Sequence, residues 1–472
     1  MELRTDRDKI AHLLRRFGLG ASENEVDFYS KGGLKGAIDA LLNYESVPDT
    51  QDIPVKKFQS GKNSNVKMPG LQAWWVAKLL TTQRPLQEKM TLFWHNHFAT
   101  SAAKVLRPAY MYQQNEVLRA NCTGKFQDLL SATSKDPAML LWLDNQFNVA
   151  GRANENFARE VMELFTLGIG HYTEKDIQES ARAFTGWAFR NAKTDDTDLG
   201  NKGRTAEFFF RERLHDGGAK KFLGNEGNFN GDDILGILCG NPQTSRFVAK
   251  KFWTWFGYSD PEPQLVEHLA STWYKSGMDI KVLIRTVMES DEFYTDKAYR
   301  HVFKNPADFV IAPMRQLGIG AQLASATQAE DLVQGVARTT IAAAQQTMKN
   351  MGMPLFFPPD VSGWAGGENW ISSATMVERM SFGPTLFSGT QASQRIKIHY
   401  DPYPLFQNDL RLESVVDKLL SIMDATLSED KRRALNHCAL ELSQGAVTQQ
   451  NAADVSGQIC RLIFSCPEYQ LC

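Results

Sequence analysis

The chain has 472 residues, of which 43% are hydrophobic and 22% are charged, and its formal net charge is −2. This composition is typical of a globular protein, and it lacks the excess of basic residues that binding to nucleic acid or to an anionic membrane usually needs. The length exceeds the size at which one hydrophobic core usually stops growing, so the sequence predicts two lobes or a large domain with an appendix.

No run of apolar residues approaches the roughly 18 that a membrane span needs, and residues 1–20 are charged and amphipathic without an apolar signal core. We therefore expect no membrane span and a cytoplasmic location, with export alongside a signal-bearing partner as the alternative. The six cysteines are scattered and form no C-x-x-C pair, which argues against a disulfide scaffold and against structural zinc held by thiolates.

Residues 8–44 contain two helical patterns separated near Gly18, and Ser22 can cap the second one. Arg15 and Arg16 lie just before this break. Their guanidinium groups could hold an anionic substrate by bidentate hydrogen bonds, or they could neutralise acidic residues such as Glu160 or Glu163.

Residues 45–70 are rich in proline, glycine and polar residues and predict a surface loop. A series of helical patterns follows. These helices are expected at about 71–82, 85–99, 106–120, 124–134 and 137–143. Pro85 and Pro137 suit the first turn of two of them, because a proline there sacrifices no helical hydrogen bond.

His95 and His97 lie two residues apart in the helix predicted at 85–99. On a regular helix two such side chains point about 200° apart, so they cannot bind one metal ion together. His97 falls on the apolar face, where a hydrogen-bonded core histidine is expected. His95 falls on the opposite face, as a capping or surface residue or as a functional one.

Residues 154–187, NENFAREVMELFTLGIGHYTEKDIQESARAFTGW, predict two helices joined by a short turn. Asn154 is the expected N-cap of the first helix, and Gly168 or Gly170 its C-cap. Thr173 and Asp176 have the spacing of a capping box for the second helix.

The first of these helices has a polar face that contains Asn156, Arg159, Glu160 and Glu163. The two glutamates are three residues apart, so their carboxylates can converge on one cation or one proton. One interpretation is a solvated polar face. The other is a site in which His95 joins Glu160 and Glu163 around zinc, manganese or iron.

Between residues 190 and 225 the hydrophobic period changes. Segments 206–213 and 214–224 predict a small β-hairpin near 205–224, turning at Asp216. His215 beside this turn could act as a general acid or base together with Asp216. The alternative is an ordinary Asp-Gly turn with an incidental histidine.

Helices return from Asp232, including one that begins at Asn241-Pro242, and residues 351–370 predict a loop rich in proline, glycine and tryptophan. Trp364 and Trp370 in this loop could offer flat faces to a sugar or an aromatic ligand, or could simply pack in a rigid loop.

The elements together predict a mainly α fold, a large multi-helix protein with one small β-hairpin insertion. The predicted division is a helical domain over residues 1–390 and a C-terminal helical appendix over residues 391–472 that packs on it.

The segment 154–187 closely resembles the signature of the bacterial domain-of-unknown-function-1800 family, and the similarity extends over about residues 8–390. The further segments that carry the resemblance are HLLRRFGLG (12–20), EKMTLFWHNHFATS (88–101), DPAMLLWLDN (136–145), HDGGAKKFLGNEGNFNGDDIL (215–235), NPQTSRFVAKKFW (241–253) and PPDVSGWAGGENWI (358–371). The family has no established reaction. The resemblance implies that relatives of this chain are often exported. It also implies a partner of the domain-of-unknown-function-1501 type, a group that resembles phosphatases and sulfatases.

Three functions are consistent with these patterns. The first is an enzyme whose polar pocket is formed by segments 88–101, 154–163, 182–187 and 215–216, with or without a divalent metal. Its catalytic candidates are His95, Arg159, Glu160, Glu163, His215 and Asp216, and its substrate-binding candidates are Arg15, Arg16, Asn156, Trp187 and Trp364. The second is a non-catalytic companion of the phosphatase-like partner, and the third is a carbohydrate-binding module.

Overall fold

The computed structural model describes residue 3 and residues 5–48, 53–59, 66–191, 205–325, 329–387, 398–443 and 446–472. Most of these residues are helical, and the described strands form only two small antiparallel sheets. The mainly α fold predicted from the sequence is therefore confirmed. No helix in the described ranges is both long enough and apolar enough to cross a bilayer.

The α-helices of the first half of the chain are α1 (Asp6–Phe17), α2 (Glu23–Ser30), α3 (Gly33–Leu42), α4 (Met68–Thr81), α5 (Pro85–His97), α6 (Ala102–Val105), α7 (Pro108–Asn121), α8 (Phe126–Ser134), α9 (Pro137–Trp142), α10 (Glu155–Glu160), α11 (Glu174–Ala183) and α12 (Gly231–Cys239). Those of the second half are α13 (Pro242–Phe256), α14 (Pro263–Lys275), α15 (Ile280–Met288), α16 (Pro306–Gln316), α17 (Ile319–Ala324), α18 (Gly335–Asn350), α19 (Ser373–Phe387), α20 (Tyr403–Phe406), α21 (Leu412–Ile422), α22 (Glu429–Ser443) and α23 (Ala452–Ser465).

Several helices begin where the sequence predicts. Pro85, Pro137 and Pro242 occupy the first turns of α5, α9 and α13. Ser22 caps α2, and Thr173 forms the expected reciprocal capping box with Asp176 at the start of α11. The first N–H groups of a helix have no partner inside it. The capping side chains accept from such groups, and a proline has no N–H to satisfy, so these residues mark where a helix can begin.

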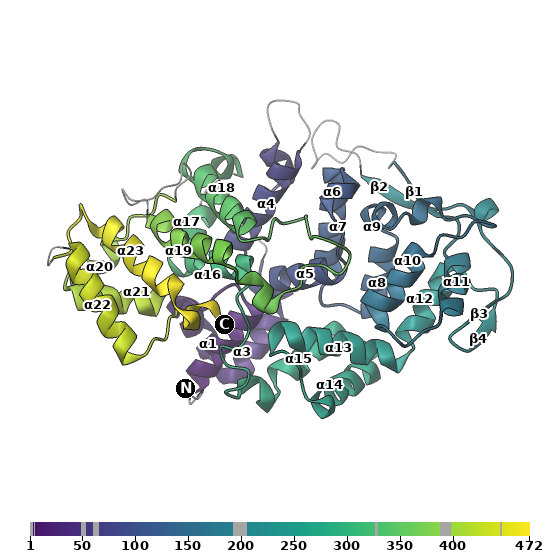
Figure 1. Ribbon diagram of the computed structural model, residues 1–472, viewed down its shortest axis with the longest axis horizontal. Helices are drawn as coiled ribbons and strands as arrows, with labels where there is room; N and C mark the ends of the chain where they lie inside the picture. The colour runs from purple at the N-terminus through teal and green to yellow at the C-terminus, as the bar shows by residue number, and fades with distance from the viewer. Residues whose placement is uncertain are drawn as a thin grey trace.

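The helices enclose two hydrophobic cores. One core joins α4 to α16, α18, α19 and the C-terminal helices α21–α23, and the other joins α1, α3 and α7–α15. Helix α5 contributes to both, because Leu92 lies in the first core and Met90 and Phe93 lie in the second. Figure 1 shows α16–α23 on one side of the molecule, α8–α12 on the other, and α5 between them.

The structure departs from the predicted hairpin. Strands β2 (Ala206–Phe210) and β3 (Lys220–Phe222) lie in the two predicted segments but do not pair with each other. Instead β2 pairs with β1 (Trp187–Asn191), and β3 pairs with β4 (Asn225–Gly227), two strands outside those segments. The second hairpin turns at Leu223 and Gly224, whose φ angles are 47° and 81°. Two successive positive φ angles are what a two-residue hairpin turn needs, so this turn, and not the one at Asp216, reverses the chain.

The predicted loop at 45–70 contains two short 3-10 turns, η1 (Tyr44–Ser46) and η2 (Val55–Phe58), and α4 begins at its end. Residues 49–52 and 60–65 of this loop lie outside the described residues, as does the predicted domain boundary near residue 390. The helices after that boundary pack closely on α19 through glycines. A Cβ atom at Gly383 would lie 2.5 Å from the main-chain nitrogen of Arg461 and 2.8 Å from the oxygen of Gly457 in α23.

We expect Gly383→Ala to lower the free energy of unfolding by about 1–3 kcal/mol, because the added methyl group would force α19 and α23 apart. The measurement is chemical denaturation of the purified protein. Gly36→Ala in α3 is the matched control, because a Cβ atom there meets nothing within 4 Å. That control should be neutral or stabilising by about 0.4–1 kcal/mol. Equal stabilities of the two variants would contradict close packing of α19 on α23.

Candidate functional site

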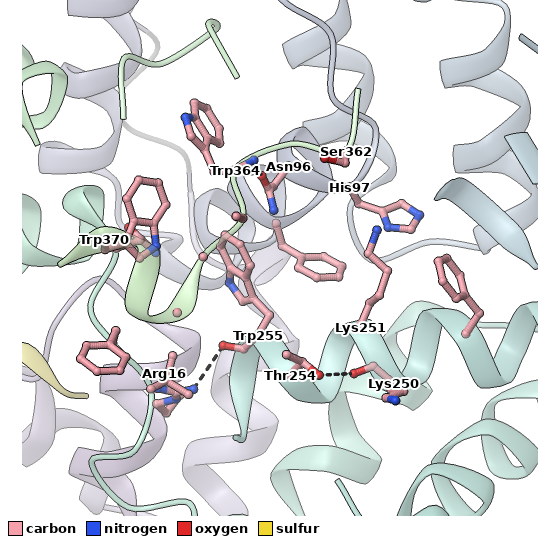
Figure 2. Close-up of a pocket in the computed structure, with 18 of the residues that line it drawn as sticks. Arg16, Asn96, His97, Lys250, Lys251, Thr254, Trp255, Ser362, Trp364 and Trp370 are labelled. Carbon is pink, nitrogen blue, oxygen red and sulfur yellow. Dashed lines mark hydrogen bonds between the residues drawn. The ribbon is translucent and has the colours of Figure 1, made fainter. Parts of the chain in front are cut away.

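A cavity of about 660 Å³ lies between α5, α13 and the loop that contains Trp364 and Trp370. Its wall also includes residues of α1, the segments 167–171 and 302–308, and Cys472. Figure 2 shows side chains from these separate segments pointing into one space. A cavity of this size suits a small-molecule ligand.

Helix α13 supplies one side of the cavity. Its lining residues recur at helical spacing and are Gln243, Phe247, Lys250, Lys251, Thr254 and Trp255. Residues three, four, seven and eight positions apart share one face of an α-helix, so a single stripe of α13 faces the cavity. This stripe carries two adjacent lysines.

The helix that carries the family-like signature does not end as a regular α-helix. Residues Val161–Thr166 form a π turn, η4, in which the N–H groups of Leu167 and Gly168 both donate to the carbonyl oxygen of Met162, at 2.8 and 3.0 Å. A π turn shifts the main-chain pairing by one residue. The last carbonyl groups of a helix have no partner inside it, so those at the end of this turn are free to accept hydrogen bonds from side chains.

Three cavity residues use those carbonyl groups. His97 Nε2 lies 3.1 Å from the oxygen of Phe165, Lys251 Nζ donates to the oxygen of Leu164 at 3.3 Å, and Gln243 Nε2 donates to the oxygen of Leu167 at 3.0 Å. All three side chains line the cavity. The π turn thus positions the polar groups of the site through its main chain.

His97 is neutral in this setting. Burial, and then the charge of Lys251, hold the pKa of His97 well below its usual value. A carbonyl oxygen can only accept, so Nε2 carries the proton. Its Nδ1 atom is then an acceptor, and within the described part of the chain it has no hydrogen-bond partner.

Lys251 is partly buried and forms no ion pair with any described residue. Burial lowers the pKa of its amine to about 8. The amine also lies over an aromatic face, with Nζ 5.4 Å from the centre of the Phe247 ring. The neighbouring Lys250 is exposed and likewise has no carboxylate partner among the described residues.

The remaining cations of the cavity are engaged within the protein. Lys89 is 2% exposed and is paired with Asp308, which is the one acidic side chain among the described lining residues. Arg15 donates to Asp424 at 2.9 Å. Arg16 donates to main-chain oxygens of Phe256 and Cys472, among others, at 2.7 and 3.0 Å. The cavity therefore keeps a positive charge after these contacts are made.

Aromatic rings form much of the remaining wall, which includes Phe93, Phe247, Trp255, Phe303, Trp364 and Trp370. Asn96 fixes the loop that carries Trp364 and Trp370, because its Oδ1 accepts from the main-chain N–H of Trp364 at 2.7 Å. Gly363 has φ of 84°, and a Cβ atom there would lie 2.4 Å from the main-chain oxygen of Asn96. The close approach of this loop to α5 therefore requires glycine.

Three of the residues predicted from the sequence line the cavity: Arg15, Arg16 and Trp364. Eight do not, namely His95, Asn156, Arg159, Glu160, Glu163, Trp187, His215 and Asp216. Of the four segments expected to form one pocket, only 88–101 contributes to this one, through Lys89, Phe93, Asn96 and His97.

The predicted metal site is wrong. His95, Glu160 and Glu163 do not form a group that could hold a metal ion, and no such group of three occurs in the described ranges. His95 lies on the opposite side of α5 from His97, enclosed by the rings of Trp75 and Phe356 at 5.1 and 5.6 Å. The two histidines do point apart, as their spacing predicts, but it is His97 that faces the cavity.

The acidic residues of the signature helix have other partners. Glu163 accepts from the Tyr172 hydroxyl at 2.7 Å. Glu160 is half-buried, and burial followed by the negative charge of Glu163 raises its pKa. Arg159 pairs with Glu174 at 2.9 Å.

The other predicted residues have structural contacts. Asn156 Nδ2 donates to the oxygen of Leu143 at 3.2 Å, and Trp187 is 2% exposed in the second core. His215 Nδ1 lies 3.0 Å from the oxygen of Thr185. Asp216 accepts from Arg182, and these hydrogen bonds lower its pKa to about 2.

The sequence interpretation missed Lys250, Lys251 and Gln243. The signal for Lys251 was present, because it lies three residues after Val248 and four before Trp255, within the apolar stripe of its helix. A lysine on an apolar stripe is either buried with a partner or placed at a site.

The fold and the cavity together define a mainly helical protein with a cationic, aromatic-walled site. The chain belongs to the family described as "Protein of unknown function (DUF1800)", whose model matches residues 12–471. This match includes the C-terminal helices, where the sequence interpretation found only a generic helical pattern. No curated protein and no solved structure matches the chain.

We expect the free energy of unfolding of His95→Phe to fall less steeply with decreasing pH than that of the wild type. The folded-state pKa of His95 is lowered to about 3 by burial, below the value of about 6.5 in an unfolded chain. The unfolded state therefore takes up the proton first, so stability is full above about pH 6.5 and is lost as the pH falls toward about 3. Between pH 6.5 and 4.5 the variant should lose about 2 kcal/mol less than the wild type in denaturation experiments.

The exposed His268, changed to Gln, is the control for that experiment and should retain the wild-type profile. If His95→Phe and the wild type lose the same stability as the pH falls, then His95 takes up a proton as readily in the folded protein as in the unfolded chain.

Gly168→Ala should destabilise the protein more than Gly170→Ala. Both glycines have positive φ, 81° and 87°, so both variants carry about 1–2 kcal/mol of backbone strain. Only at Gly168 would the new Cβ atom also meet a side chain, the Phe247 ring at 2.7 Å, which adds about 1 kcal/mol. Thermal and chemical denaturation of the pair measure the difference, and equal losses would refute the contact between this turn and α13.

Proposed function

We propose that the protein binds a small organic anion with a flat apolar part in this cavity and acts on it as an enzyme. The observation that carries the proposal is the pair Lys250 and Lys251, which face an aromatic-walled cavity without a carboxylate partner among the described residues. A partly buried cation without a counter-ion is unfavourable, and a bound anion would remove that penalty.

The aromatic residues of the cavity wall favour a ligand with a planar part. Trp255 and Trp364 line the same cavity as Lys251. Aromatic rings bind flat apolar groups through offset or edge contacts. A ligand with a ring at one end and a carboxylate or phosphate at the other would satisfy both sides of the cavity.

The catalytic part of the proposal depends on Lys251. Burial lowers the pKa of its amine to about 8. An amine of this kind in a cavity can take up and release a proton near neutral pH, whereas burial and the charge of Lys251 keep the neighbouring His97 neutral.

The other two functions predicted from the sequence need different features. A companion of a phosphatase-like protein, in the cytoplasm or exported with it, would not need the cavity lysines. A carbohydrate-binding module would need open tryptophan faces, and Trp364 and Trp370 are each 6% exposed. Both functions stay predictions, and dependence of activity on the cavity lysines separates them from an enzyme.

The binding proposal can be tested by calorimetric titration with phenyllactate and phenyl phosphate, with 3-phenyl-1,2-propanediol as an uncharged analogue. The anions should bind better than the diol, and added salt should weaken their binding. Lys251→Met should weaken anion binding about tenfold or more, because a charge-assisted hydrogen bond contributes about 1.5–3 kcal/mol.

Lys275→Met is the matched control for that titration, because Lys275 is an exposed lysine that does not line the cavity. It should leave anion affinity unchanged. If neither anion binds better than the diol, or if the two lysine variants behave alike, the proposal is wrong.

A further inference from the structure

We infer that Lys251 forms a Schiff base with a carbonyl group of the ligand, so that the substrate class is small oxo acids with a flat apolar part. This inference rests on the proposed anion-binding function and narrows it. It depends on the position of Lys251 relative to the other lysines, on His97 beside it, and on the cavity that admits a ligand to both.

The cavity contains three lysines in different settings. Lys89 is buried and forms an ion pair with Asp308. Lys250 is exposed to solvent. Lys251 alone of these three is partly buried and lacks an acidic partner in the described structure. A nucleophilic lysine needs this combination, because the neutral amine is the reactive form.

The hydrogen bond of Lys251 also suits a nucleophile. Its Nζ donates to the oxygen of Leu164 at 3.3 Å, a weak contact with a neutral group. This bond directs the amine without holding a charge on it. Burial lowers the pKa of the amine to about 8, so roughly a tenth of it is neutral at pH 7, against less than about a thousandth for an ordinary lysine.

His97 is the neutral polar neighbour of Lys251. Figure 2 shows the Lys251 amine pointing toward the His97 ring, and the charge of Lys251 is one cause of the lowered pKa of that histidine. A neutral neighbour gives the amine no counter-ion, which favours the uncharged, nucleophilic form of Lys251.

The step balances without a further reactant. The neutral amine nitrogen attacks the carbonyl carbon, a C–N bond forms, and the first of the two amine protons is transferred to the oxygen, which gives a carbinolamine. The second amine proton is then transferred to the hydroxyl oxygen, the C–O bond breaks, and water leaves, so that one amine and one carbonyl give one imine and one water. Lys250, the next residue along the chain, would attract the carboxylate of the substrate. The Phe247 ring, whose centre lies 5.4 Å from Lys251 Nζ, would contact the flat part of the substrate.

The test is reductive trapping with phenylpyruvate, which has a ketone beside a carboxylate and a phenyl ring. The full-length protein is incubated with phenylpyruvate and sodium cyanoborohydride, which reduces an imine to a stable secondary amine. Intact mass measurement and peptide mapping then locate the adduct. We expect one adduct per chain, on Lys251, and a labelling rate that rises as the pH approaches about 8.

Three variants sharpen the result. Lys251→Arg retains the positive charge and should still bind phenyllactate but form no adduct. Lys250→Met should still be labelled on Lys251, but only at a higher phenylpyruvate concentration. Lys275→Met should behave like the wild type. Adducts spread over exposed lysines, or an undiminished adduct in Lys251→Arg, would overturn the inference.

Phenyllactate, which has a hydroxyl in place of the ketone, separates failure of the inference from failure of the proposed function. If phenyllactate binds the wild-type cavity and phenylpyruvate leaves no adduct on Lys251, anion binding stands and the Schiff base is excluded. If neither compound binds, both proposals fail. If phenyllactate competes with labelling of Lys251, both are supported.

Discussion

The π turn at Val161–Thr166 is the constraint on which the site depends. It ends the signature helix with main-chain carbonyl groups that no helical N–H takes up, and His97, Lys251 and Gln243 are directed toward those groups. The last carbonyl groups of any helix lack a partner inside the helix. Here three of them, at and just after the end of the π turn, accept from three side chains of two other helices.

The charge of the cavity depends on which of its cationic side chains have acidic partners. Asp308 compensates Lys89, and Asp424 compensates Arg15, while Arg16 is surrounded by main-chain oxygens. No carboxylate among the described residues compensates the two lysines of α13, and His97 is kept neutral by burial. The positive charge is therefore concentrated on one helix face, in a cavity whose walls are largely aromatic.

The sequence predicted much of the fold because its signals are local. Prolines at first-turn positions and the capping box of Thr173 and Asp176 act within a few residues, and the structure contains them as expected. The hairpin pairing was less predictable, since a two-residue turn at Leu223 and Gly224 competes with the Asp-Gly turn and differs only in backbone angles.

The sequence did not predict which groups of residues 154–187 meet this cavity. They contribute main-chain oxygens and the segment 167–171, and not the Glu160 and Glu163 carboxylates. An amphipathic wheel places side chains, but it does not show which other side chains reach the free carbonyl groups at the end of a helix. The same regular geometry did predict that His95 and His97 diverge, because α5 is an undistorted α-helix up to His97.

Arg16 has a consequence for how the protein is made. Its guanidinium group donates to Phe256, 240 residues along the chain, and to Cys472, 456 residues along the chain. Contacts between such distant residues form only after a large loop has closed. A chain still being synthesised can carry both lysines of α13 without enclosing them, because the part of the cavity wall that Cys472 supplies is made last.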